Sequence, residues 1–254
     1  AQQAVHRNGK WYWYVCCNTA QGGDALAVAV ADSPTGPWKD AIGGPLATGW
    51  GYIDPTVFID DDGKAYLVHA WAASRSKMNS ILVACEMNAE GTAVIGKPVL
   101  IYDGNDGVNH TVEGPKLYKR DGWYYIFAPA GGLEQGWQLA MRSKSIYGPY
   151  EVRRVMEQGD TDINGPHQGG WVETPQGESW FVHFQDKAMY GRIIHLNPMA
   201  WHDGWPVIGE DKDGDGCGNP VRRHAKPKVN GKHPKTTPVE SDEFNSRQLG
   251  LQWE

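Results

Sequence analysis

Two carboxylates and an imidazole recur at matching places in this sequence. Counted back from the turn glycine of a repeated hairpin, they lie nine, nine and ten residues away: Asp54 before Gly63, Glu113 before Gly122, and His167 before Gly177. Two carboxyl groups in one cleft, with pKa values pulled apart by their surroundings, are the usual groups of glycoside hydrolysis. We therefore expect Glu113 to be a general acid, kept protonated by burial and nearby negative charge. Asp54 would be its companion, either a base or a group that raises its pKa and orients it.

Each of these residues also has a purely structural interpretation. Asp-Pro and Glu-Gly-Pro are common turn sequences, so Asp54 and Glu113 could simply cap strand ends. His167, in NGPHQGG, could contact a substrate, bind a metal or be a structural histidine. The shared spacing favours the functional interpretation, because a repeated fold brings equivalent residues together.

Three further residues could contact a sugar. Arg192 follows a glycine and begins a predicted strand, although it could equally be an ordinary edge-strand cation. Trp50 and Trp137 lie beside glycines in predicted loops, where a ring can stack on a sugar face. The chain has 12 tryptophans, so most of them must belong to the core.

The spacing comes from a β-hairpin that occurs four times. Its copies are HRNGKWYWYVCC, DDDGKAYLVHAW, YKRDGWYYIFAP and TPQGESWFVHFQ, with turn glycines 54, 59 and 55 residues apart. Further strands are predicted at 25–31, 80–86, 137–142 and 192–196. A β unit that repeats about every 55 residues is typical of a propeller blade, whereas solenoids have shorter periods and sandwiches lack a long repeat. The sequence therefore predicts an all-β fold, a β-propeller with about four blades present.

The composition argues against several classes of function. A formal net charge of −6 disfavours nucleic acid as a partner, and no apolar run is long enough to span a membrane. The sequence has no G-x-S-x-G elbow, phosphate-binding glycine loop or H-E-x-x-H motif.

The cysteines and one acidic run could in principle form other sites. Cysteines at 16, 17, 85 and 217 match neither a zinc spacing nor a disulfide framework, so free thiols are expected, with a disulfide between distant strands left open. The run from Asp211 to Gly216 matches the first half of a calcium loop. Arg222 stands where an EF-hand needs Glu, so this run is predicted to be a solvated acidic turn.

Four segments, in this order, resemble glycoside hydrolase family 43: YIDPTVFIDDDGKAYL, HTVEGPKLYKRDGWYYIFAPAGG, GPHQGGWVETPQGESWFVHFQD and GRIIHLNPMAWHDGWPVIG. The resemblance implies a five-bladed β-propeller and an inverting β-xylosidase, α-L-arabinofuranosidase or arabinanase. It implies Glu113 as the general acid, Asp54 as the aspartate that tunes and holds it, and Arg192 as a sugar contact. His167 would lie beside, or ligate, a structural Ca²⁺ at the propeller axis; no organic cofactor is expected.

The resemblance also implies a domain organisation. Residues 1–221 would be the catalytic propeller with its first blade missing or incomplete, 222–238 a linker, and 239–254 the beginning of a C-terminal β-sandwich. The family's general base is an aspartate in that first blade, so we expect this chain to be a piece of a longer, active enzyme. The compartment stays open, with secreted or periplasmic favoured over cytoplasmic.

The function predicted from the sequence is an exo-acting, inverting glycosidase of plant cell-wall pentosans. Its partner would be a xylo-oligosaccharide or an arabinose-substituted saccharide, with no nucleic acid and no membrane. The alternatives are an endo-arabinanase, a carbohydrate-binding propeller without catalysis, and a protein-interaction propeller. The last would not be expected to gather Asp, Glu and His at one register.

Overall fold

The structure, a computed structural model, describes residues 2–19, 23–231, 234 and 243–249. These residues form four antiparallel sheets. The first holds β1 (Gln3–Arg7), β2 (Lys10–Asn18), β3 (Asp24–Ala31) and β4 (Lys39–Asp40), with β5 (Ala47–Thr48) paired to β3. The second holds β6 (Tyr52–Ile59), β7 (Ala65–Trp71), β8 (Ile81–Met87) and β9 (Val99–Asp103).

The other two sheets repeat this plan. The third holds β10 (Lys116–Arg120), β11 (Trp123–Ala130), β12 (Trp137–Ser143) and β13 (Glu151–Glu157), and the fourth holds β14 (His167–Glu173), β15 (Ser179–Asp186), β16 (Arg192–His202) and β17 (Trp205–Ile208). Two short helices lie in connections: α1 (Ala73–Ser76) after β7, and the 3₁₀ turn η1 (Ala188–Tyr190) before β16.

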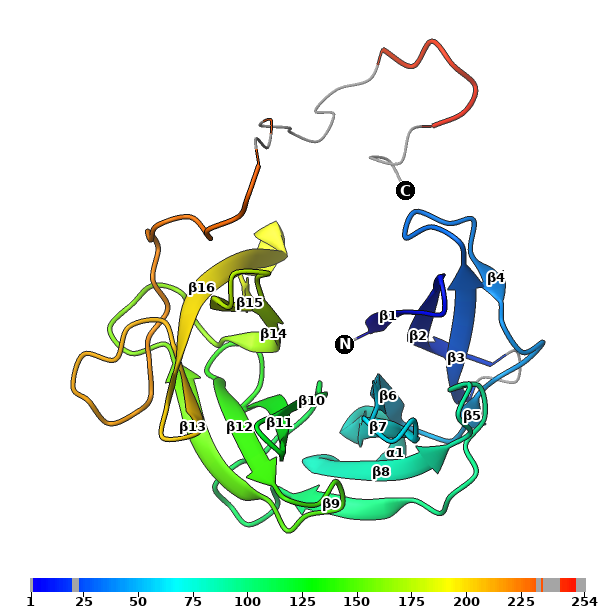
Figure 1. Cartoon of the computed structure of the whole chain (residues 1–254), viewed down its shortest axis with the longest axis horizontal. Coiled ribbons are helices and arrows are strands. Elements are labelled where there is room, and N and C mark those ends of the chain that lie inside the picture. Colours follow the sequence, from blue (N-terminus) through cyan, green and yellow to red (C-terminus); the bar gives the residue numbers. More distant parts are fainter. Residues whose placement is uncertain (1, 20–22, 232–233, 235–242, 250–254) are drawn as a thin grey trace.

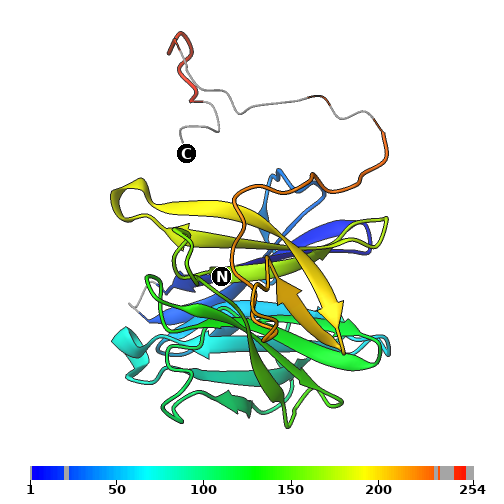
Figure 2. The ribbon, with the colours of Figure 1, turned by 90° about the vertical axis from the view of Figure 1, so that its left-hand side faces the viewer.

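The four sheets are the blades of a β-propeller. Apart from β5, the strands of each sheet pair in chain order, and the sheets follow one another around a ring (Figure 1). In the view from the side, the β14–β17 blade lies above the β10–β13 blade (Figure 2). Strands β1, β6, β10 and β14 lie nearest the centre, and the β14–β17 and β1–β4 blades face each other across the opening of the ring (Figure 1). The prediction of an all-β propeller with about four blades is confirmed.

The four predicted hairpins are present, but their turns are of two kinds. Asn8-Gly9 and Asp121-Gly122 have positive φ at both residues, as a type I′ turn requires. Gly63 and Gly177 instead close longer loops, in which each donates its N–H to the carbonyl three residues earlier. Both kinds of turn connect two adjacent strands of one blade, so the difference in turn type does not alter the 55-residue repeat.

Apolar side chains fill the spaces between neighbouring blades. The second and third blades each have another blade packed on both faces, so both faces of these sheets carry apolar residues. Between the first and second blades lie Tyr14, Leu26, Val57 and Leu67; between the second and third, Val68, Leu82, Ile126 and Leu139; between the third and fourth, Phe127, Phe181, Met199 and Ile208. This packing fixes the inner strands, and with them the residues at their ends.

The remaining structural predictions have mixed outcomes. All four cysteines are free thiols, so the disulfide alternative is wrong. No helix among the described residues has the length and apolar character needed to cross a bilayer. Residues 222–231 contain no strand, and part of them packs on the last blade: His224 Nε2 lies 2.7 Å from Leu196 O. The predicted sandwich at 239–254 lies largely outside the described residues, so the domain boundaries stay predictions.

Candidate active site

Glu113 and His167 meet at the ends of two neighbouring inner strands. His167 Nε2 lies 2.7 Å from Glu113 Oε1, and the two residues are 54 positions apart in the sequence. The imidazole is fully buried, whereas a quarter of the Glu113 side chain is exposed. The Glu113 N–H donates to the carbonyl of Pro129 in β11, at 3.2 Å, which anchors the backbone. Glu113 is thus a fixed carboxyl group with one side open to solvent.

The surroundings of Glu113 set its pKa in the direction opposite to the sequence-based expectation. Burial of the carboxyl raises the pKa, but the hydrogen bond and charge of His167, together with a hydrogen bond from Gln168, hold the pKa below its usual range. Donors that point at a carboxylate stabilise its ionised form. The expectation of a raised pKa was wrong because the sequence could not show that an imidazole nitrogen points at this group.

Asp54 holds the loop that carries Glu113. Its Oδ2 accepts the backbone N–H of Gly114 at 2.9 Å and the side-chain amide of Gln168 at 3.0 Å. Asp54 is only 8% exposed, so these bonds are shielded from water. The geometry is therefore that of a residue that orients its neighbour through the backbone.

The backbone around these side chains adopts uncommon conformations. Asp54 and Gln168 have φ of 55° and 51°, and each lies in a β-bulge of its inner strand. A left-handed conformation costs a residue with a side chain about 1–2 kcal/mol, and such strain is found mainly at functional sites. Gly114 has φ of 58°, and a Cβ there would lie 2.5 Å from Gln168 Oε1. Only glycine lets the amide of Gln168 come this close.

Gln168 is a site residue that the sequence analysis missed. Its amide donates to Asp54 and also to Glu113, so it links the two carboxylates. The signal was present in the count, because Gln168 lies nine residues before Gly177, the same interval as for Asp54 and Glu113. The sequence analysis assigned this position to His167, one residue earlier, because of its imidazole.

Arg192 lies at the same end of the blades as Glu113 and His167. It begins β16, opposite Asp186 at the end of β15, and its side chain is exposed. Its guanidinium carbon lies 4.7 Å from the centre of the Phe184 ring, which in turn is 5.6 Å from the ring of His167. Phe184 therefore joins Arg192 to the Glu113–His167 pair.

The two predicted tryptophans differ in their surroundings. Trp50 is 62% exposed in the loop before β6. Trp137, at the start of β12, is partly buried: its Nε1 donates to Asn109 Oδ1 at 3.1 Å, and Arg154 lies over the ring at 4.0 Å. Trp137 therefore supports the loop before Glu113, whereas Trp50 presents a free ring face.

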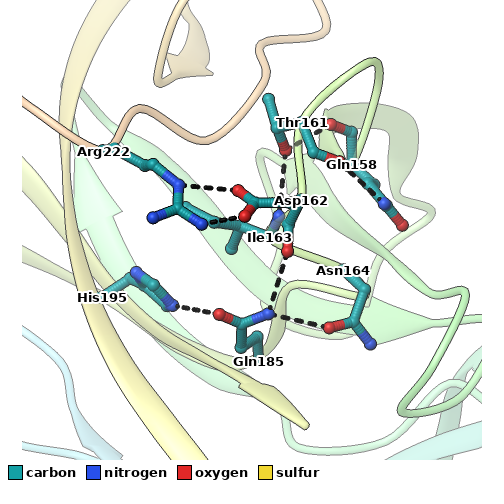
Figure 3. Close-up of polar contacts among 8 residues, drawn as sticks. All are labelled: Gln158, Thr161, Asp162, Ile163, Asn164, Gln185, His195 and Arg222. Carbon is teal, nitrogen blue, oxygen red and sulfur yellow. Dashed lines mark hydrogen bonds and ion pairs between the residues drawn. The ribbon is translucent and has the colours of Figure 1, made fainter. Parts of the chain in front are cut away.

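A polar network fixes the segment that leads into β14 (Figure 3). The amide of Gln185 donates to Asp162 O at 3.2 Å and to Asn164 Oδ1 at 2.9 Å, and its oxygen lies 2.9 Å from His195 Nε2. The carboxylate of Asp162 also pairs with Arg222. These contacts hold the chain at Asp162 and Asn164, shortly before it reaches His167.

Among the described residues, no group of three or more carboxylate, imidazole or thiol ligands gathers at His167. Calcium takes six to eight oxygen ligands in proteins, whereas His167 offers nitrogen and its Nε2 is bonded to Glu113. Nδ1 is buried and has no hydrogen-bond partner among the described residues, which leaves it one bond to a small group such as water. We therefore derive no catalytic step through a metal.

The acidic turn forms a second cluster of carboxylates. Ligand atoms of Asp211, Asp213 and Asp215 lie within 4.8 Å of one another, and Asp211 accepts the N–H groups of Gly214 and Gly216. Asp213 and Asp215 are exposed, and strand β17 rather than a helix precedes the turn. These side chains form an exposed acidic cluster in a turn, and the prediction that the turn holds no calcium stays a prediction.

A family model described as Glycosyl hydrolases family 43 matches residues 1–206. The chain belongs to this family. It is 37% identical over 249 residues to a putative β-xylosidase of Xylanibacter ruminicola, covering 98% of this chain and 44% of that protein. It is 28% identical to a non-reducing end α-L-arabinofuranosidase of Bacteroides ovatus, covering 98% and 46%.

Solved family 43 structures have the same fold. The crystal structure of a xylan β-1,4-xylosidase from Bacillus halodurans superimposes with a TM-score of 0.81 at 27% identity, covering 99% of this chain and 50% of that one. The chain thus spans about half the length of the relatives that it matches.

Proposed function

We propose that the full-length protein is an exo-acting, inverting glycosidase that removes xylose or arabinofuranose from plant cell-wall pentosans. The observation that carries this proposal is the Glu113 carboxyl, open on one side and held by His167 on the other. The printed names of its relatives, β-xylosidase and α-L-arabinofuranosidase, support the same reaction class.

In this mechanism Glu113 gives its proton to the glycosidic oxygen as the bond to the sugar breaks. The His167 N–H stabilises the carboxylate that remains, so it makes Glu113 a stronger acid while lowering the fraction protonated before reaction. Asp54 holds the loop in place through Gly114, and Arg192 binds the sugar. Inversion also needs a carboxylate base about 6.5–9.5 Å from the acid, which activates water from the opposite face.

The test is the turnover of p-nitrophenyl β-xyloside and α-arabinofuranoside by the full-length protein, with the first-formed anomer followed by NMR. The proposal expects hydrolysis of at least one substrate, and the first sugar released should have the anomeric configuration opposite to that of the substrate. The ratio of the two rates names the preferred sugar. Retained configuration would contradict the mechanism. Turnover of neither substrate, with measurable binding of xylo-oligosaccharides, would instead indicate a carbohydrate-binding propeller.

A further inference from the structure

The loop 49–51, which joins β5 to β6, presents Trp50 on a fixed backbone. The N–H of Gly49 donates to Asp24 O at 3.1 Å, and the N–H of Gly51 donates to Asp24 Oδ2 at 2.6 Å. On its other side, Gly51 O accepts the N–H of Ala72 at 2.8 Å. An exposed aromatic ring on an ordered loop loses little conformational freedom when it binds a ligand.

An ion pair beneath the loop holds it against α1. Asp24 is 4% exposed, and the oxygen that accepts from Gly51 also accepts from Arg75 Nε at 2.6 Å. A buried carboxylate needs such partners to offset its lost hydration. Gly51 has φ of 83°, and a Cβ there would lie 2.6 Å from Ser76 in α1. The loop is therefore clamped between β3 and α1, with the ring of Trp50 left outside the clamp.

A hollow of about 390 Å³ opens beside the ring and is lined by Thr19, Gly23, Asp24, Thr48, Gly49 and Trp50. This volume lies within the range of small-molecule sites, roughly 300–1,000 Å³. The lining combines an aromatic face with hydroxyl groups, which suits the apolar face and the hydroxyls of a sugar ring. The loop ends where β6 begins, two residues before Asp54, so it lies at the same end of the inner strands as Glu113.

We propose that Trp50 and this hollow form a subsite for a sugar on the leaving-group side of the substrate, with Asp24 and Arg75 as positioning residues for the ring. Its assignment to the leaving-group side rests on the proposed function. Saccharide binding at the hollow follows from the loop geometry and can be tested without turnover.

The kinetic test compares Trp50→Ala, Trp50→Phe and Ile95→Ala in the full-length protein, with xylotetraose as substrate. Ile95 is 63% exposed on another connection of the β6–β9 blade and serves as the matched control. Trp50→Ala should raise KM roughly tenfold and leave kcat within about twofold. Trp50→Phe, which keeps an aromatic ring, should have a KM close to that of the parent. A KM for Trp50→Ala equal to that of Ile95→Ala would overturn the subsite.

The positioning role is tested by a double-mutant cycle. Arg75→Gln should raise KM in the parent but have no further effect once Trp50 is Ala, and Arg75→Lys should restore part of the loss. Equal effects of Arg75→Gln in both backgrounds would show that the ion pair supports the fold alone.

Calorimetric titration of xylotetraose into the Glu113→Gln protein separates this inference from the proposed function. If Trp50→Ala weakens this binding roughly tenfold while the parent, with Glu113 intact, turns over no glycoside, the subsite stands and the glycosidase function falls. If binding is unchanged by Trp50→Ala while the parent turns over its substrates, the function stands and the subsite is refuted.

Discussion

Replacing Asp54 tests how Glu113 is held in position. Asp54→Ala removes the acceptor of two bonds, from Gly114 N at 2.9 Å and from Gln168 Nε2 at 3.0 Å. A hydrogen bond to a charged group contributes about 1.5–3 kcal/mol. The bond to Gly114 acts directly on the loop of Glu113, so its loss alone should lower kcat/KM by roughly 10–10²-fold. The loss of both bonds should also lower the melting temperature.

Asp54→Asn is the matched control for this prediction. An asparagine oxygen can accept both bonds without the charge, and asparagine tolerates the observed φ of 55° better than alanine does. Steady-state kinetics on an aryl glycoside, with thermal unfolding of each variant, should therefore rank the parent above Asn and Asn above Ala. If Asn falls as far as Ala, the charge of Asp54 matters rather than its acceptor geometry, and the positioning argument is refuted.

Three further predictions concern pH and metal. A general acid must be protonated, so kcat/KM should fall as pH rises through the lowered pKa of Glu113. His167→Ala should move this fall in the pH profile to higher pH, and His167→Gln, which keeps a neutral donor, should move it less. A fall at unchanged pH would exclude His167 as the cause of the lowered pKa. Burial lowers the pKa of His69 to about 4, so the stability due to its neutral form is complete above its ordinary pKa of 6.5 and is lost as pH falls toward 4. Chemical denaturation should show that His69→Phe removes about 3 kcal/mol of this acid sensitivity, and an unchanged pH profile would contradict the assignment. EDTA should leave kcat within about twofold, because the described residues gather no cluster of metal ligands at His167. A large loss restored by Ca²⁺ would show a metal requirement.

The blades were predictable because their signals are local. A turn glycine after an apolar run, followed by alternating aromatic residues, marked all four hairpins, and an even spacing between them marked the repeat. The spacing identified Asp54 and Glu113 because the blades are equivalent. Residues at the same distance from the turn glycine therefore lie at the same end of their inner strands. The same count, applied strictly, would have found Gln168.

What the sequence could not supply depends on contacts between blades. The bond between His167 Nε2 and Glu113 joins two blades, and it reversed the expected direction of the Glu113 pKa. Trp50 and Trp137 have similar glycine neighbours, yet only the fold shows that Asn109 and Arg154 hold Trp137 while Trp50 stays exposed. Residue type suggested these sites, and packing distinguished them.

The most direct test of the central claim is the kinetics of Glu113→Gln beside the parent, on xylobiose and on p-nitrophenyl β-xyloside. Glutamine keeps the shape of the side chain but has no acidic proton to give, so the rate on xylobiose should fall roughly 10²–10⁴-fold. The loss should be smaller on the aryl glycoside, because nitrophenolate leaves without full protonation. Equal rates for variant and parent on xylobiose would show that Glu113 is not the acid.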